Sequence, residues 1–229
     1  MIPIRDENPT RSFPIVNYGL IAINILVFIW QVNLGPAGDT TFAQLALVPA
    51  NVTRGLDLGD VRATLTSMFM HAGLAHLLGN MLYLWIFGDN VEDALGHVRY
   101  LAFYLAGGFF ASFTHVFLYP MSTIPTVGAS GAIAAVLGAY LLLYPHQRVV
   151  TIIPLGFFIQ VARLPAVIVL GVWFLLQLFE GAMALGMAEL GGVAFWAHIG
   201  GFAFGMLLGP LLRRRKPVIR YYDDDWKRW

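Results

Sequence analysis

The sequence predicts an all-α membrane protein, a bundle of six transmembrane helices. The first observation is composition: the 229 residues are 58% hydrophobic and 12% charged, with a mean hydropathy of +0.70. One soluble core of this length does not bury that much apolar surface. The second observation is that the apolar residues gather into stretches, most of them near the length that crosses a bilayer. Polar connections separate these stretches, so we expect each stretch to form one helix.

The expected helices follow directly from these stretches. They lie near Ile15–Leu34, Leu74–Phe87, Val98–Tyr119, Thr126–Tyr144, Leu164–Gly186 and Gly192–Leu212. The second stretch is short, and the preceding residues 65–70 either extend it or form a separate interfacial turn. The connections are 35–64, 88–97, 120–125, 145–163 and 186–192.

The basic residues predict the topology. When connections are assigned alternately to the two sides, 12 of the 14 Lys and Arg residues lie on one side, and only Arg54 and Arg62 lie opposite. Cytoplasmic segments carry the excess of basic residues, so both termini are expected in the cytoplasm. We divide the chain into a cytoplasmic tail (1–14), a six-helix domain (15–212) and a second cytoplasmic tail (213–229). The first helix is expected to be a retained anchor.

Several function classes are disfavoured by what the sequence lacks. A net charge of +1 without a basic face argues against a nucleic-acid partner, and the lack of Cys excludes disulfides and thiolate chemistry. No His-Glu-x-x-His motif and no pair of helix-borne aspartates is present, which disfavours the zinc and the aspartyl classes of intramembrane protease. We expect no metal and no cofactor. A transporter or channel is disfavoured because neither an internal repeat nor charge through the core is visible. The lack of Cys and the short tails favour a prokaryotic plasma (inner) membrane.

Four polar residues inside the expected spans are the candidates for chemistry. Polar side chains in a membrane are costly, so they indicate either function or a hydrogen bond between helices. His76 and Asn80 are four residues apart and share a helix face. Ser130 opens the fourth helix and His198 lies near the start of the sixth.

The positions of these residues along their helices predict a common depth. Ser130 is 14 residues from Tyr144, His198 is 15 from Arg213, and His76 is 13 from Asp89. At about 1.5 Å per residue, each lies roughly 20 Å above the cytoplasmic boundary. In a hydrocarbon layer about 30 Å thick, they meet roughly 10 Å below the outer surface.

Small residues predict how the fourth and sixth helices approach each other. Gly201, Gly205 and Gly209 lie on the face of His198, and small residues at this spacing let a neighbouring backbone come close, although most such seams only pack. A Ser hydroxyl needs a base within hydrogen-bond reach. Gly128 and Gly131 flank Ser130 and leave N–H groups free at a helix N-terminus, where negative charge is stabilised. His76 and Asn80 are suitable side-chain donors to the same oxyanion.

Together these motifs resemble the rhomboid intramembrane serine proteases, from about Ile15 to Leu212. The matching segments are Thr66-Ser67-Met68-Phe69-Met70-His71, the array His71-x4-His76-x3-Asn80, Gly128-Ala129-Ser130-Gly131 and Ala197-His198-x2-Gly201-x3-Gly205.

The resemblance implies a rhomboid-like bundle in a lipid bilayer that cleaves transmembrane protein substrates. It implies a catalytic dyad of Ser130 and His198, oxyanion donors at His76 and Asn80, and a structural role for His71 beneath the outer loop. It further implies a structural carboxylate at Glu92 and a lateral gate of the fifth helix with the loop 186–195. No oligomeric state is implied.

Two positions depart from the family pattern. The outer-loop Trp-Arg pair reads Val61-Arg62 here, and Ala134 stands where some members place a Tyr against the catalytic His. We therefore expect another group to orient His198. A rhomboid-like pseudoenzyme that binds membrane clients without cutting them is the alternative, and it would normally lack the Ser or the His.

Overall fold

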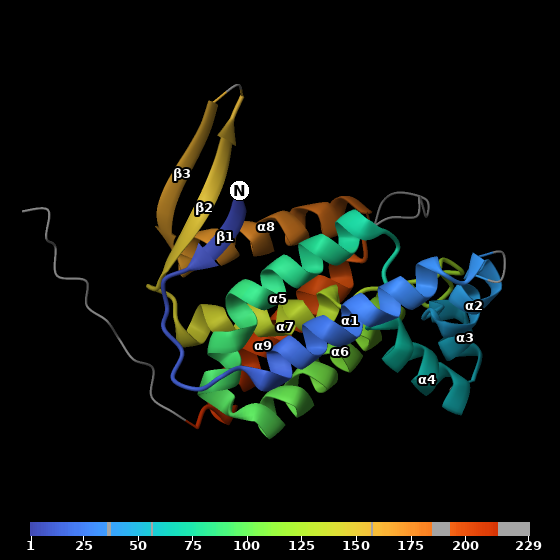
Figure 1. Ribbon diagram of the computed structural model, residues 1–229. Helices are drawn as coiled ribbons and strands as arrows, with labels where there is room; N and C mark the ends of the chain where they lie inside the picture. Colours follow the sequence, from blue (N-terminus) through green and yellow to red (C-terminus); the bar gives the residue numbers. More distant parts are fainter. Residues whose placement is uncertain (36–37, 56, 157, 185–192, 215–229) are drawn as a thin grey trace, which may run out of the picture.

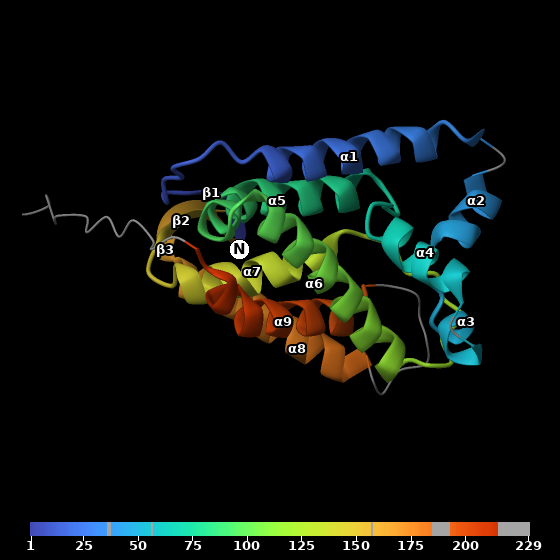
Figure 2. The same cartoon turned by 90° about the horizontal axis from the view of Figure 1, so that it is seen from below.

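The computed structural model describes residues 1–214 apart from 36–37, 56, 157 and 185–192. Its long helices lie side by side in one bundle, with the short helices at one end and a small sheet at the other (Figures 1 and 2). In chain order the elements are β1 (Ile2–Asp6), α1 (Ile15–Val32), α2 (Gly38–Leu45), α3 (Pro49–Arg54), α4 (Leu58–Ser67), α5 (Leu74–Leu95), α6 (His97–Leu118), α7 (Ser130–Leu143), β2 (Arg148–Leu155), β3 (Phe158–Pro165), α8 (Ala166–Ala184) and α9 (Phe195–Leu212).

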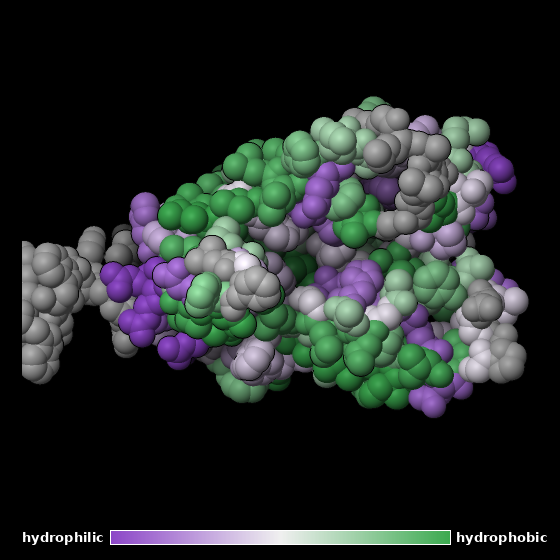
Figure 3. Space-filling view, turned by 90° about the horizontal axis from the view of Figure 1, so that it is seen from above, coloured by the Kyte–Doolittle hydropathy of each residue, from purple (hydrophilic) through white to green (hydrophobic). Residues whose placement is uncertain are grey.

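The helices have the character expected of a membrane bundle. In the described part of the chain, α1, α6, α8 and α9 are long and apolar enough to cross a membrane. Helix α5 has 22 residues but carries acidic residues in its last turns, and α7 is an apolar helix of 14 residues. Hydrophobic residues dominate the face seen in Figure 3, and hydrophilic residues gather mostly toward its two ends. The mostly helical membrane fold is confirmed with four candidate spans, and the count of six stays a prediction.

The expectation of an all-α fold is wrong, because β1, β2 and β3 form an antiparallel sheet in the order β1-β2-β3. The connection 145–163, expected to be irregular, contains β2 and most of β3, and the N-terminal tail contains β1. Strand β2 reads Arg-Val-Val-Thr-Ile-Ile-Pro-Leu, and β-branched residues of this kind favour strands. Gly156 supplies the left-handed conformation of the hairpin turn, with φ of 61°.

Helix α5 continues beyond the predicted end at Phe87 to Leu95. Its last turns contain Glu92, which is fully buried. The Glu92 carboxylate accepts the backbone N–H groups of Val16 and Asn17, at 3.0 and 2.7 Å, in the first turn of α1. First-turn N–H groups have no partner within their own helix, so they stabilise the buried carboxylate. Most of the predicted connection 88–97 is therefore helical.

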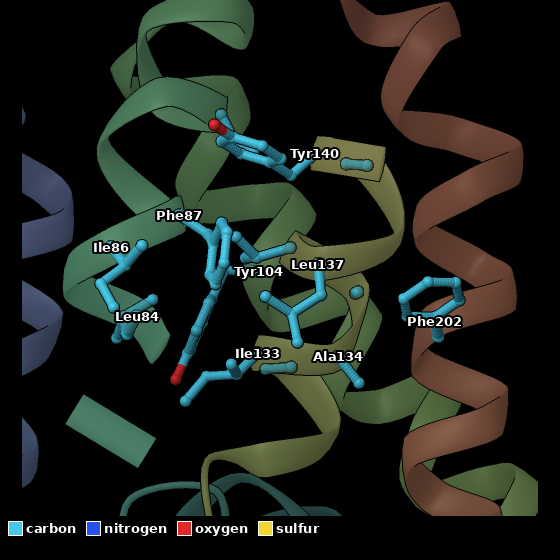
Figure 4. Packing of buried hydrophobic residues seen from close by; sticks show 14 of the residues in the cluster. Leu84, Ile86, Phe87, Tyr104, Ile133, Ala134, Leu137, Tyr140 and Phe202 are labelled. Carbon is cyan, nitrogen blue, oxygen red and sulfur yellow. The ribbon is translucent and has the colours of Figure 1, made fainter. Parts of the chain in front are cut away.

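Helix α7 occupies the centre of the bundle. Leu137 on α7 lies against Phe87 of α5 and Tyr104 of α6, while Phe202 of α9 covers the opposite side of α7 (Figure 4). All four side chains are fully buried. The first residue of this central helix is Ser130, so the core fixes the position of the candidate nucleophile.

The connection 35–64 forms α2, α3 and most of α4. Residues 65–70 do not extend α5, since α4 ends at Ser67 and α5 begins at Leu74. A bridge between Leu47 and Thr126 joins this region to the segment before α7, and the Gly128 N–H donates to the Ser67 carbonyl at 2.9 Å. The region of the short helices therefore fixes the position of residues 126–128, which directly precede the start of α7 at Ser130.

Candidate active site

Glycines on α9 let its backbone lie directly against that of α7. A Cβ atom at Gly201 would overlap the carbonyl oxygen of Gly131, and a Cβ at Gly205 would overlap that of Ala135. Only glycine leaves room for so close an approach. The contact brings the first turns of the two helices together, and with them Ser130 and His198.

The Ser130 hydroxyl and the His198 imidazole are within hydrogen-bond distance. Ser130 Oγ lies 2.8 Å from His198 Nε2. His198 is buried, with 8% of its surface exposed. This is the geometry in which an imidazole accepts the proton of a serine hydroxyl.

Gln177 on α8 is a further site residue, which the sequence reasoning missed. Its Oε1 lies 2.6 Å from His198 Nδ1, on the opposite side of the ring from Ser130. The Trp173 ring packs beside the same imidazole, with centroids 5.9 Å apart. A signal existed, because Gln177 is a polar side chain in an apolar expected span. Gln177 and Trp173 are therefore the groups that contact the imidazole here, where Ala134 replaces the Tyr that some family members place against the catalytic His.

His76 and Asn80 face the same cavity as Ser130 and His198, which has a volume of about 670 Å³. The Ala72 N–H points to His76 Nδ1 at 3.4 Å, which favours a proton on Nε2. Asn80 is buried, and its Nδ2 has no hydrogen-bond partner in the described part of the chain. Both side chains therefore offer N–H donors to a group in the cavity.

Gly128 shapes the wall between these donors and Ser130. Its φ of 135° lies in the region that favours glycine. A Cβ there would lie 2.8 Å from His76 Cε1, so a larger residue would displace the imidazole. Helix α7 begins two residues later, and the N–H groups of its first turn have no partner within the helix.

His71 lies beside this site rather than in its wall. Its backbone N–H donates to Gln31 Oε1 at 3.0 Å, and Gln31 Nε2 donates to the His71 carbonyl at 3.3 Å. The His71 ring meets the His76 ring edge-on at 5.1 Å, and neither His71 ring nitrogen has a partner in the described residues. Gln31 thus ties α1 to the segment between α4 and α5, a contact that the sequence did not indicate.

Two predicted features are not described by the structure. Most of the expected gate loop, 186–195, lies outside the described residues, as do the basic residues from Arg215 onward. Within the described residues, no group of three or more His, Asp or Glu is arranged to hold a metal ion.

Comparison with known proteins gives consistent matches. A family model described as the Rhomboid domain matches residues 59–215. The chain is 33% identical over 191 residues to Rhomboid protease GluP of Bacillus subtilis, covering 78% of this chain and 36% of that protein. It is 29% identical over 214 residues to the mitochondrial Presenilin-associated rhomboid-like protein A of Danio rerio, covering 90% and 51%. It is 36% identical over 186 residues to RHOMBOID-like protein 4 of Arabidopsis thaliana, covering 78% and 40%. The chain spans about half or less of the length of these relatives.

Proposed function

Because the chain belongs to the rhomboid family, we propose that it is an intramembrane serine endopeptidase that cleaves transmembrane segments of other membrane proteins. The observation that carries the proposal is the 2.8 Å contact between Ser130 Oγ and the buried His198 Nε2, in the wall of the cavity. One relative is named a protease and others are named rhomboid-like proteins.

In the acylation step, His198 Nε2 takes the proton of Ser130 as Oγ attacks the carbonyl carbon of the scissile peptide bond. The carbonyl oxygen becomes an oxyanion, and preorganised N–H donors stabilise it as the charge develops. His76 Nε2, Asn80 Nδ2 and the Ser130 backbone N–H are the proposed donors. Asn80 Nδ2 supports this role, because it has no hydrogen-bond partner among the described residues and a ligand oxygen would satisfy it.

Collapse of the tetrahedral intermediate breaks the peptide bond. His198 gives its proton to the leaving amine, and the acyl group remains as an ester on Ser130. His198 next takes a proton from water, the resulting hydroxide attacks the ester carbon, and Ser130 Oγ leaves with the proton returned by His198. The product departs as a carboxylic acid that loses its proton to water, and Ser130 and His198 are back in their starting protonation states.

The substrate has to present an extended peptide bond, because a helix hides its carbonyl carbons behind side chains and its own hydrogen bonds. We propose substrates whose transmembrane helices unwind easily near their outer ends, where Gly costs a helix about 1 kcal/mol and Pro about 3. Gly128 and Gly131 line the cavity, which favours small side chains at the cleaved position.

A fluorophosphonate probe with intact-mass detection tests the nucleophile. The detergent-purified protein should gain one phosphonyl group on Ser130, and Ser130→Ala should gain none. His198→Ala should react far more slowly, because the general base is lost. Ser112→Ala is the matched control, since Ser112 lines the same cavity and should not be needed. Equal labelling of Ser130→Ala and wild type would refute the proposed nucleophile, whereas no labelling of wild type would favour a pseudoenzyme.

A further inference from the structure

We propose that Gln177 is a positioning residue that holds His198 in the tautomer required of a general base. This inference rests on the proposed function and adds a third member to the dyad. The described side-chain hydrogen bonds of His198 are those to Ser130 and Gln177, at 2.8 and 2.6 Å. They lie at the two ring nitrogens, so the partner at one nitrogen determines what the other can do.

The direction of the bond follows from the chemistry of the amide. Gln177 Oε1 can only accept, so the proton of the neutral imidazole resides on Nδ1. Nε2 is then left with a free lone pair directed at the Ser130 hydroxyl. With the proton on Nε2 the ring would donate to Ser130 and could not remove its proton. Gln177 therefore selects the productive tautomer without touching the substrate.

The packing of α8 on α9 fixes the position of the amide. Trp173, Gln177 and Gly181 are four residues apart and form one stripe of α8, and each contacts α9. Trp173 packs beside His198, and the Gly181 carbonyl accepts the indole Nε1–H of Trp196 at 3.1 Å. A Cβ at Gly181 would approach Ile199 to 3.2 Å, so the helices are close there. Contacts between α8 and α9 on both sides of Gln177, at Trp173 and at Gly181, thus fix the position of its side chain.

A neutral amide suits this place better than the carboxylate of soluble serine proteases. Gln177 is 8% exposed, and an isolated ionised carboxylate buried in apolar surroundings is expensive. The amide oxygen accepts the same hydrogen bond without that cost. Loss of the orienting bond should slow the chemical step, since it leaves the imidazole free to rotate or change tautomer.

The test compares Gln177→Met with Gln177→Glu. Met has a similar shape but is only a weak acceptor, whereas Glu keeps a strong acceptor at the same place. We expect Gln177→Met to lower kcat about 10- to 100-fold, the range for removing a group that orients a functional imidazole. KM and the melting temperature should change little. The rate of Ser130 labelling by the fluorophosphonate should fall by a similar factor. Gln177→Glu should recover most of both losses in rate, while its melting temperature should fall, because a carboxylate is costly to bury there.

The outcomes separate this proposal from the proposed function. If wild type cleaves a single-span substrate but Gln177→Met keeps its full kcat, or raises only KM, the positioning role is overturned. Equal losses in the Met and Glu variants would also overturn it, because the acceptor would not be what matters. If wild type were no more active than Ser130→Ala, the proposed function would fail and the role of Gln177 with it.

Discussion

At the scale of single residues, the polar groups of the site divide by what they contact. Ser130 and His198 contact each other, Asn80 and His76 face the cavity, and His71 is buried beside them. Ser130, His198, Asn80 and His76 could be predicted as a set, because polar residues are rare in membrane spans and the expected depths of these four agree. The partner at His198 Nδ1 could not, because it depends on the rotation of one helix against another, which spacing within each helix does not determine.

Asn80 and His71 should respond differently to truncation. Asn80→Ala should lower kcat roughly 10²- to 10³-fold with little change in melting temperature, because an oxyanion donor acts mainly in the transition state. His71→Ala should mainly lower the melting temperature, since a buried ring is replaced by a void. Steady-state kinetics and thermal unfolding in detergent measure both effects. Loss of catalysis in His71→Ala at an unchanged melting temperature would contradict this division.

At the scale of elements, the close approach of α7 and α9 creates the site, and the sheet closes the other end of the bundle. The glycine seam was predicted from its spacing, since the small residues lie on the His198 face of the helix. The sheet was not predicted, because hydropathy separates spans from connections but not strands from loops. The β-branched run Val149–Ile153 was the available signal.

Adding one methyl group at the seam should separate the two helices. Gly201→Ala places a Cβ against the Gly131 carbonyl, so it should cost about 1–3 kcal/mol of stability. A displacement of about 1 Å between Ser130 and His198 should lower kcat about 10²-fold. Gly171→Ala on α8 is the control, because a Cβ there has no neighbour within 4 Å in the part of the chain that the structure describes. Equal activity of the two variants would show that the approach of the helices is not what aligns the site.

The attachment of β1 to the bundle should depend on pH. Asp6 accepts a hydrogen bond from Tyr140 at 2.6 Å, and burial raises the pKa of its carboxyl from 3.8 to about 7. The folded protein then binds more protons than the unfolded chain between these values. This contribution to stability is complete below about pH 4 and is lost as the pH rises toward 7.

Thermal unfolding in detergent across this pH range measures the effect. Asp6→Asn cannot ionise, so its melting temperature should fall less than that of wild type as the pH rises. Parallel curves for the two proteins would contradict the assigned role of Asp6.

At the scale of the whole molecule, the family resemblance read from the motifs is confirmed by the family match over residues 59–215. Composition was sufficient to predict a membrane protein, because so high an apolar content means that much of the protein surface contacts lipid and not water. It was insufficient for the helix ends, since α5 continues through Glu92, whose partners lie on α1. The orientation in the membrane stays a prediction that rests on the basic residues.

Single cysteines introduced into this Cys-free chain test the orientation. Leu58 on α4 and Val98 on α6 are comparably exposed, at 87% and 82%, and lie on predicted opposite sides. A membrane-impermeant maleimide added from outside to bacterial spheroplasts that express the variants should label Leu58→Cys. It should label Val98→Cys only after permeabilisation. The reverse pattern would contradict the assignment of both termini to the cytoplasm.

The most direct test of the account is the position of the cut in a membrane-spanning substrate. The protein and a single-span substrate are reconstituted together in liposomes, beside Ser130→Ala, and the products are identified by mass spectrometry. We predict cleavage after small residues, roughly 10 Å inside the outer boundary of the substrate helix, and none with Ser130→Ala. Cleavage that persists in Ser130→Ala, or that clusters at the cytoplasmic end of the helix, would contradict the account.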